Sequence, residues 1–359
     1  MASAENKPPR KPVIGITMGD PAGVGAEVVV KALADAKLRR RARFVVFGLN
    51  EQLTYAADLA EIEPYWHRLQ HDAARATYAL VHDVVVLDYD EENSLGAWDD
   101  PRPSRQHGIA SLRFLDDAAA AAQRSIDQNG IDALVTAPIA KASWHLAGCN
   151  FPGHTEFLQH RTKAKRAAMM FVGTEPDGRP IRTVLATIHL ALMDLRNTLT
   201  IGTVHDAIDL GHQALLDLGV KQPRIGVAGL NPHASENGAF GDEERRLIEP
   251  AIQLAQKHGI DARGPFPADT LYTPVNRKRF DLTVAMYHDQ GLIPLKALAF
   301  DNAVNLTLGL PIIRTSPDHG TAFDIAGKNR ADPRSMIQAI NLAITQAEHR
   351  IAHAATSVA

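Results

Sequence analysis

The stretch VIGITMGDPAGVGAEVVVKALADA, residues 13–36, decides the fold class. Its β-branched beginning, Val13–Thr17, predicts a buried strand, and its end, Ala26–Ala36, predicts a helix. The three glycines between them allow a tight turn, and the first turn of such a helix presents free N–H groups to an anion. Their spacing matches neither a dinucleotide-binding fingerprint nor a Walker loop, so this turn does not predict a Rossmann-type cofactor site.

The same alternation of strand and helix continues along the chain, which predicts an α/β protein with largely parallel strands covered by helices. With 359 residues the chain exceeds what one compact core usually supports, so two domains are expected, although no break in composition separates them. The further predicted strands are Phe44–Gly48, Val84–Leu87, Ala133–Ala137, Ala168–Val172, Thr183–His189, Ile225–Leu230, Leu282–Met286 and Val304–Leu308. The further predicted helices are Gly108–Asp127, Thr203–Leu218, Asp242–His258 and Pro333–Ala355.

The composition argues against nucleic-acid and membrane partners. The formal net charge is -3, which gives no general attraction to a polyanion. There is no run of about 18 apolar residues that could cross a membrane. Residues 1–10 are polar and lack the apolar core of a secretion signal, and the single cysteine, Cys149, fits a reducing compartment. We therefore expect a cytoplasmic enzyme.

Three histidines are the most informative candidates for chemistry. His189, His233 and His288 each stand at or next to the carboxyl end of a predicted apolar strand. If these strand ends converge, three imidazoles can bind one divalent metal and leave a position for substrate. Imidazole suits zinc, cobalt, nickel or iron better than calcium. The long separations form no local metal motif, so from the residues alone a metal site and ordinary structural histidines both remain open.

Other polar residues suggest a small anionic substrate. The motif Gly153-His154-Thr155-Glu156 offers hydrogen-bond donors beside a glycine that allows close backbone approach. Lys296 and Arg314 could bind a phosphate ester, and Asn305 is a polar residue inside an apolar stretch. The alternatives are a surface role for Lys296, Asn305 or Arg314, and an ordinary helix start at Thr155-Glu156.

A loop of small residues, 318–328, precedes the last predicted helix and could wrap an adenosine. Within it, Asp324 could accept hydrogen bonds from ribose hydroxyls and would repel a 2′-phosphate, which favours NAD over NADP. The alternative is an ordinary turn.

Taken together, six ordered motifs resemble the 4-hydroxythreonine-4-phosphate dehydrogenase family of pyridoxal phosphate biosynthesis, from about Val13 to Ile340. The resemblance implies an isocitrate/isopropylmalate dehydrogenase-like fold, with the active site in a cleft between two α/β domains. It implies a cofactor-side domain of residues 1–147 plus 309–359 and a metal-binding, dimerising domain of residues 148–308. It also implies a homodimer in which one metal histidine comes from the partner. The motifs are residues 19–25, 153–158, 229–233, 267–270, 287–291 and 318–322.

The resemblance also implies a role for each matching residue. The metal ligands would be His189, His233 and His288, with zinc as the first choice of metal and magnesium or cobalt as alternatives. The substrate contacts would be His154, Thr155, Lys296, Asn305 and Arg314. The cofactor, NAD or NADP, would contact His319, Gly320, Thr321 and Asp324, in a loop where Phe323 replaces the proline of isopropylmalate dehydrogenases. Asp269, Asp289 and Lys296 are the catalytic candidates, although either aspartate could instead orient a metal histidine.

The expected reaction is the oxidation of 4-phosphooxy-L-threonine, followed by decarboxylation to 3-amino-2-oxopropyl phosphate. Because the first motif reads Thr-Met-Gly-Asp-Pro where biosynthetic members read Thr-Pro-Gly-Glu-Pro, a paralogue that oxidises erythronate or threonate 4-phosphate is the main alternative. The Gly-His-Thr-Glu motif argues against an aromatic dihydrodiol substrate. A metal-dependent aldolase or hydrolase without nicotinamide, and a catalytically silent binding protein, are the alternatives from other classes.

Overall fold

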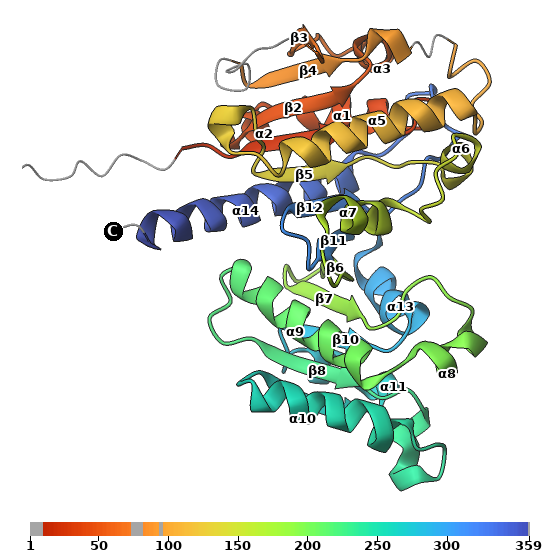
Figure 1. Cartoon of the computed structure of the whole chain (residues 1–359), viewed down its shortest axis with the longest axis vertical. Helices are drawn as coiled ribbons and strands as arrows, with labels where there is room; N and C mark the ends of the chain where they lie inside the picture. The colour runs from red at the N-terminus through yellow and green to blue at the C-terminus, as the bar shows by residue number, and fades with distance from the viewer. Residues whose placement is uncertain (1–9, 73–81, 93–95, 358–359) are drawn as a thin grey trace, which may run out of the picture. The chain divides into compact units, whose positions relative to one another are not determined.

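The computed structural model describes residues 10–72, 82–92 and 96–357, so the polar N-terminal tail, residues 1–9, lies outside the described part. The chain forms two compact units, Met1–Gly153 with His319–Ala359 and His154–Asp318 (Figure 1). Strand β12, Ile313–Pro317, falls in the second unit, whereas the sequence placed residues 309–318 with the first.

The first unit contains a parallel sheet in the order β3-β4-β2-β1-β5. Helix α5 packs on β1, β2 and β5, while α14 packs on β1 and β5 and against α1. The strands are β1 (Val13–Thr17), β2 (Arg43–Gly48), β3 (His67–Gln70), β4 (Val84–Asp88) and β5 (Ala133–Thr136). The helices are α1 (Gly25–Leu33), α2 (Ala36–Arg41), α3 (Asn50–Leu59), α5 (Arg105–Ala121), α6 (Lys141–Leu146) and α14 (Arg334–Ser357), with 3-10 turns η1 (Asp90–Glu92) and η2 (Ile126–Gln128).

The second unit contains a mixed sheet in the order β12-β11-β6-β7-β10-β8-β9. The pairs from β12 to β7 are antiparallel, and those from β7 to β9 are parallel. The strands besides β12 are β6 (Ala168–Thr174), β7 (Pro180–Leu185), β8 (Arg224–Ala228), β9 (Asp261–Phe266), β10 (Leu282–Ala285) and β11 (Val304–Leu308). The helices are α7 (His154–Thr162), α8 (Leu195–Thr198), α9 (Ile201–Asp217), α10 (Glu249–Lys257), α11 (Ala268–Leu271), α12 (Pro274–Arg277) and α13 (His288–Ala299). Shorter helical turns are η3 (Leu192–Asp194), η4 (Pro232–Gly238), η5 (Glu244–Ile248) and η6 (Phe300–Asn302).

The core of the second unit is an apolar layer between the sheet and α13. Leu292 and Leu295 of α13 pack with Phe171 of β6 and Leu185 of β7. Helix α9 lies along β6, β7, β8, β10 and β11 (Figure 1). Because α13 begins at His288 and is held on the sheet by these side chains, the core fixes the position of that histidine.

Two predicted strands end earlier than expected. Strand β7 ends at Leu185 rather than His189, and β8 ends at Ala228 rather than Leu230. The residues beyond these ends leave the sheet, and Thr187 instead donates its hydroxyl to the carbonyl of Met286 at 2.7 Å. The candidate histidines therefore stand on loops that follow the strands rather than within the sheet.

Candidate active site

The three candidate histidines follow three adjacent parallel strands, β7, β10 and β8. Two side chains connect the loops at the carboxyl ends of these strands. Thr187 binds the carbonyl of Met286, and Gln290 donates its amide to the carbonyl of Gly229 at 2.7 Å. The segments that carry His189, His288 and His233 are thus connected to one another through hydrogen bonds to backbone.

His189 and His288 lie together. Their ring centroids are 5.8 Å apart, with the rings tilted by 42°. Both line a cavity of about 460 Å³, together with Tyr287 and Asp289. Two imidazoles that share a cavity form a donor set that fits a divalent metal such as zinc or cobalt.

Carboxylates hold two of the three imidazoles. Nδ1 of His288 lies 2.7 Å from Oδ1 of Asp289, and Nδ1 of His233 lies 2.7 Å from Oε2 of Glu236. A carboxylate that accepts from Nδ1–H leaves the lone pair on Nε2, the tautomer that a metal ligand needs. Asp289 thus occupies the position expected of a residue that orients a metal histidine. Glu236 does the same for His233, and the sequence did not predict it.

The described residues contain no group of three metal-binding side chains within one chain. His233 lies in the separate turn η4, where its side chain is 64% exposed. A single chain therefore places two of the predicted ligands together and leaves the third in an open position.

The turn that carries His233 is left-handed. Five consecutive residues other than glycine, from His233 to Asn237, have φ between 46° and 75°. For L-residues this conformation costs roughly 1–2 kcal/mol each, so such a run is rare and indicates a constraint imposed by its surroundings. Ser235 stabilises the turn by donating its hydroxyl to the carbonyl of Gly241 and accepting from the N–H of Gly238, each at 2.8 Å.

Replacing Ala234 by glycine is expected to raise the free energy of unfolding by about 0.5–1 kcal/mol, because glycine adopts a positive φ without the Cβ clash. Urea unfolding measures the change. Ala297→Gly, at an exposed position in right-handed helix α13, is the control and should instead lose about 1 kcal/mol. A loss of stability in both variants would contradict the left-handed geometry.

Arg314 is a buried cation among the candidate substrate residues. Arg314 on β12 lies opposite Thr307 on β11, and its Nη1 donates to Thr307 Oγ1 at 2.9 Å. Arg314 is only 2% exposed. Burial lowers the pKa of Arg314 to about 9, against the opposing effect of the Glu156 charge, so it remains a cation at neutral pH. A buried guanidinium at a strand pair is suited to an anionic group.

His154 lies in the same region. It begins α7, and its ring Nε2 is enclosed although the residue keeps some exposed surface. Burial, and secondly the charge of Arg314, lowers the pKa of His154 well below its ordinary value, so the imidazole is neutral at physiological pH. Thr155 is also buried, and the buried Oδ1 of Asn305 has no hydrogen-bond partner within the described residues. The group offers a cation, a neutral imidazole and an acceptor.

The neutral His154 makes the fold sensitive to acid. Below pH about 6.5 the unfolded chain binds one proton here that the folded chain does not. The free energy of unfolding therefore falls by up to about 1.4 kcal/mol for each pH unit below that value. The variant His154→Gln should lose stability less steeply between pH 6.5 and 5, as followed by urea unfolding. His258→Gln, at an exposed histidine, is the control, and equal slopes for wild type and His154→Gln would contradict the buried neutral state.

The remaining catalytic candidates are less buried. Lys296 Nζ lies 2.9 Å from Oδ2 of Asp318, a partner that the sequence did not predict. Asp269 is exposed on α11, a helix that contacts β8 and the turn η4. The structure thus gives Lys296 an ion pair and places Asp269 on a helix beside the turn of His233.

The candidate cofactor residues, from His319 to Asp324, lie in the first unit, and their loop contacts the glycine-rich turn after β1. The N–H of Val24 donates to the carbonyl of Thr321 at 2.9 Å, and a Cβ on Gly23 would lie only 3.0 Å from Thr321. The indole of Trp98 donates to the carbonyl of Gly23 at 3.1 Å. Asp324 remains exposed. Gly23 of the first motif therefore makes room for the candidate cofactor loop.

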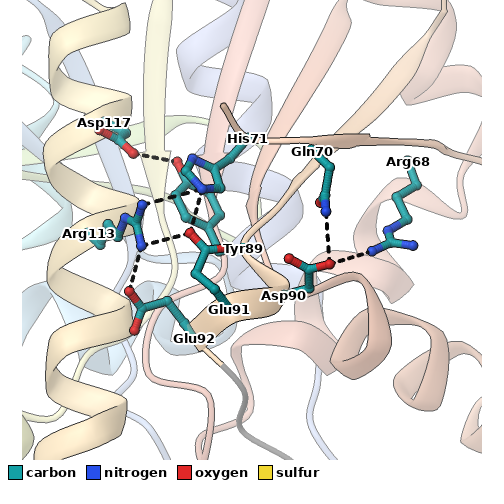
Figure 2. Close-up of polar contacts among 9 residues, drawn as sticks. All are labelled: Arg68, Gln70, His71, Tyr89, Asp90, Glu91, Glu92, Arg113 and Asp117. Atoms are coloured by element: carbon teal, nitrogen blue, oxygen red, sulfur yellow. Dashed lines mark hydrogen bonds and ion pairs between the residues drawn. The ribbon is translucent and has the colours of Figure 1, made fainter. Parts of the chain in front are cut away.

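A polar cluster that the sequence did not predict also lies in the first unit. Figure 2 shows Arg113 on α5 between Glu91 and Glu92, each at 2.8 Å, and the ring of His71 beside that of Tyr89. These two rings stack with centroids 4.2 Å apart. The members of this cluster form ion pairs and ring contacts with one another. The cluster therefore connects the end of β4 and η1 to α5.

Comparison with known proteins identifies the family. A model of the family "Pyridoxal phosphate biosynthetic protein PdxA" matches residues 40–343. The chain belongs to this family. A PdxA relative from Desulfosudis oleivorans, a 4-hydroxythreonine-4-phosphate dehydrogenase, is 43% identical over 339 residues, covering 94% of this chain and 96% of that protein. A D-threonate 4-phosphate dehydrogenase from Cupriavidus necator is 42% identical over 330 residues, covering 92% and 95%.

Comparison with solved structures agrees with this family assignment. The 4-hydroxythreonine-4-phosphate dehydrogenase of Klebsiella pneumoniae has a TM-score of 0.79 and 37% identity, covering 94% of this chain and 100% of that chain. The isocitrate dehydrogenase of Methylococcus capsulatus has a TM-score of 0.50 at 14% identity, covering 95% and 89%, which shows the fold alone. The predicted PdxA-type family, its dehydrogenase class and the isocitrate dehydrogenase-like α/β fold are confirmed. No helix among the described residues is long and apolar enough to cross a membrane.

Proposed function

We propose that this PdxA family member oxidises 4-phosphooxy-L-threonine with NAD and then decarboxylates the product to 3-amino-2-oxopropyl phosphate. The observation that carries the proposal is the buried cation Arg314 beside neutral His154, in the same unit as the paired His189 and His288. An anion site and a site for a divalent metal are what a phosphorylated hydroxy acid requires.

The side chains of this chain bind and orient the substrate. Arg314 and Lys296 would hold its anionic ends, and the free acceptor of Asn305 would take a hydrogen bond from a hydroxyl or an amine. His154 would stay neutral, so it could donate to or accept from the substrate without adding charge. Asp289 would orient His288 rather than abstract a proton. Asp269 or Lys296 would then act as the general base.

His189, His233 and His288 would hold the divalent cation, with zinc first and cobalt or magnesium as alternatives. When bound, the cation supplies Lewis acidity that lowers the pKa of the hydroxyl to be oxidised and polarises the resulting ketone. The nicotinamide would supply the hydride acceptor, and a base of the protein would take the hydroxyl proton. Loss of the carboxylate as carbon dioxide would leave its electron pair on the ketone as an enolate, which a proton returned to the carbon would quench. We assign the cofactor to His319, Gly320, Thr321 and Asp324, with NAD preferred because Asp324 would repel a 2′-phosphate.

We further propose a cytoplasmic homodimer with shared sites. The pair His189–His288 lies in one cavity, and exposed His233 is the histidine that the chain leaves apart, so His233 of a second copy would complete the metal site.

Mixing inactive variants tests the shared site. His233→Ala combined with His288→Ala should recover about a quarter of wild-type activity, because each hybrid dimer contains one intact site. His189→Ala combined with His288→Ala should recover none, because every hybrid site then lacks one ligand. Equal recovery from both mixtures would contradict the assignment of His233 to the partner's site.

NADH absorbance tests the reaction. The purified chain, with NAD and zinc or cobalt, should reduce NAD with 4-phosphooxy-L-threonine and release carbon dioxide. D-threonate or erythronate 4-phosphate is the second candidate substrate, favoured by the 42% identical relative from Cupriavidus necator. Reduction with a sugar acid phosphate and none with the amino acid would overturn the first choice, and no reduction with either would overturn the dehydrogenase assignment.

A further inference from the structure

Glu244 is a buried carboxylate that the sequence did not connect with any site. It is 2% exposed. Its Oε1 accepts from the backbone N–H of Leu230 at 2.8 Å and of Asn231 at 2.7 Å, and its Oε2 accepts from the side-chain amide of Asn231 at 2.9 Å. All three donors belong to the two residues that lead into the turn η4, which carries His233.

The backbone at Glu244 is irregular. Glu244 begins η5, a stretch of π-helix that runs to Ile248 and continues into α10. Single π-helical turns are rare and occur frequently at functional sites. Here the π-helical turn begins at Glu244, whose carboxylate accepts hydrogen bonds from Leu230 and Asn231.

A second side chain holds the same segment. Gln290, two residues after His288, donates its amide to the carbonyl of Gly229 at 2.7 Å and accepts from the N–H of Met286 at 2.6 Å. Gly229 fits tightly here, because a Cβ on it would lie 3.1 Å from Oε1 of Glu244 and 3.0 Å from Ala234. The stem 229–231 is therefore fixed to α13 by Gln290 and to η5 by Glu244.

The strained turn needs a fixed stem. The five left-handed residues, 233–237, would relax toward ordinary backbone conformations if Leu230 and Asn231 could move. Such relaxation would displace His233 and its partner Glu236.

We propose that Glu244 is a positioning residue that clamps the stem 229–231 and so holds His233 where it can bind the metal. This inference rests on the proposed function for the metal, but the clamp itself can be measured without metal. Glu244 would act through the backbone of Leu230 and Asn231 and would not itself be a metal ligand.

The test uses the full chain with Glu244→Gln. Glutamine keeps the shape of the side chain but removes its charge, and it places an N–H group opposite the side-chain amide of Asn231. Glu249→Gln, at an exposed glutamate in the first turn of α10, is the matched control. Two quantities are measured. The first is deuterium exchange of residues 229–241 in metal-free protein, with α9 as the internal reference. The second is the affinity for zinc and cobalt alone, by competition with a fluorescent chelator.

We expect Glu244→Gln to exchange residues 229–241 at least about tenfold faster with α9 unchanged, and to bind metal about 10–100-fold more weakly, while Glu249→Gln behaves as wild type. Unchanged exchange would overturn the clamp, and faster exchange with unchanged metal affinity would overturn the positioning role. If the wild-type protein binds no metal, the proposed metal site is refuted, and the positioning role of Glu244 with it. Faster deuterium exchange in Glu244→Gln would then show only that Glu244 holds residues 229–231 in place.

If Glu244→Gln does not fold, Asn231→Ala is the second variant. It keeps the two backbone hydrogen bonds to Glu244 and removes the side-chain amide, which donates to Glu243 Oε2 at 2.8 Å as well as to Glu244. It should shift exchange and metal affinity in the same direction by a smaller factor, and wild-type values for both would overturn the proposal.

Discussion

Replacing Arg314 by methionine is expected to lower kcat/KM for the phosphorylated substrate at least about 1,000-fold, equivalent to about 4 kcal/mol. The buried guanidinium would form charge-assisted hydrogen bonds to the substrate that no other residue on β11 or β12 can replace. Without the ligand this cation is poorly solvated, as its lowered pKa indicates. Steady-state NADH formation with metal-loaded protein measures the loss.

The same substitution should leave the chain folded. Methionine fills similar volume without a buried charge, but Thr307 Oγ1 loses its donor and Glu156 loses an opposite charge, so the free energy of unfolding should fall by no more than about 1–3 kcal/mol. Arg182→Met is the control, because Arg182 is a half-buried cation that donates to the carbonyl of Asp281, which is not a candidate site residue. Failure of Arg314→Met to fold would show that Arg314 supports the fold rather than the substrate.

Replacing His288 by alanine is expected to abolish tight metal binding and to lower kcat/KM at least about 1,000-fold, because stabilisation of charge by a bound metal contributes several kcal/mol. Asp289→Asn should have a milder effect, weakening metal affinity about 10–100-fold, since it only orients the imidazole. Metal content by mass spectrometry and NADH formation, measured on the same samples, check both variants.

His258→Ala is the control for that series, because His258 is exposed at the end of α10 and away from the cavity of His189 and His288. It should keep full metal content and activity. Retention of metal by His288→Ala would remove His288 from the ligand set, and equal effects of His288→Ala and Asp289→Asn would contradict the separation of ligand from orienting residue.

The sequence predicted the α/β class because its central strands, such as β1, β2 and β10, are short and mostly apolar runs rich in β-branched residues. It missed β3, β9 and β12, which contain many polar residues or, in β9, Gly264-Pro265. Such strands depend on pairing with a neighbour rather than on their own pattern. It also missed α13, because Gly291 and Pro294 argue against a helix that tertiary packing on β6 and β7 stabilises.

For the site, the sequence pointed to residues but not to their arrangement. Strand-end placement brought out His189, His233 and His288, and the structure pairs only His189 with His288. The supporting residues were missed because nothing in their local sequence marks them. Glu244 reaches Asn231 from 13 residues away, and Gln290 reaches Gly229 from 61. The left-handed turn after Asn231 was likewise invisible, since none of its five strained residues is a glycine.

The most direct test of the metal-dependent dehydrogenase is a titration. Metal is removed from the purified chain with a chelator, zinc or cobalt is added back in steps, and NADH formation with 4-phosphooxy-L-threonine is measured at each step. Activity should be absent without metal, rise in proportion to the metal bound, and reach its maximum at about one metal per chain. Full activity in the metal-free protein, or a maximum unrelated to bound metal, would contradict the central role of the three histidines.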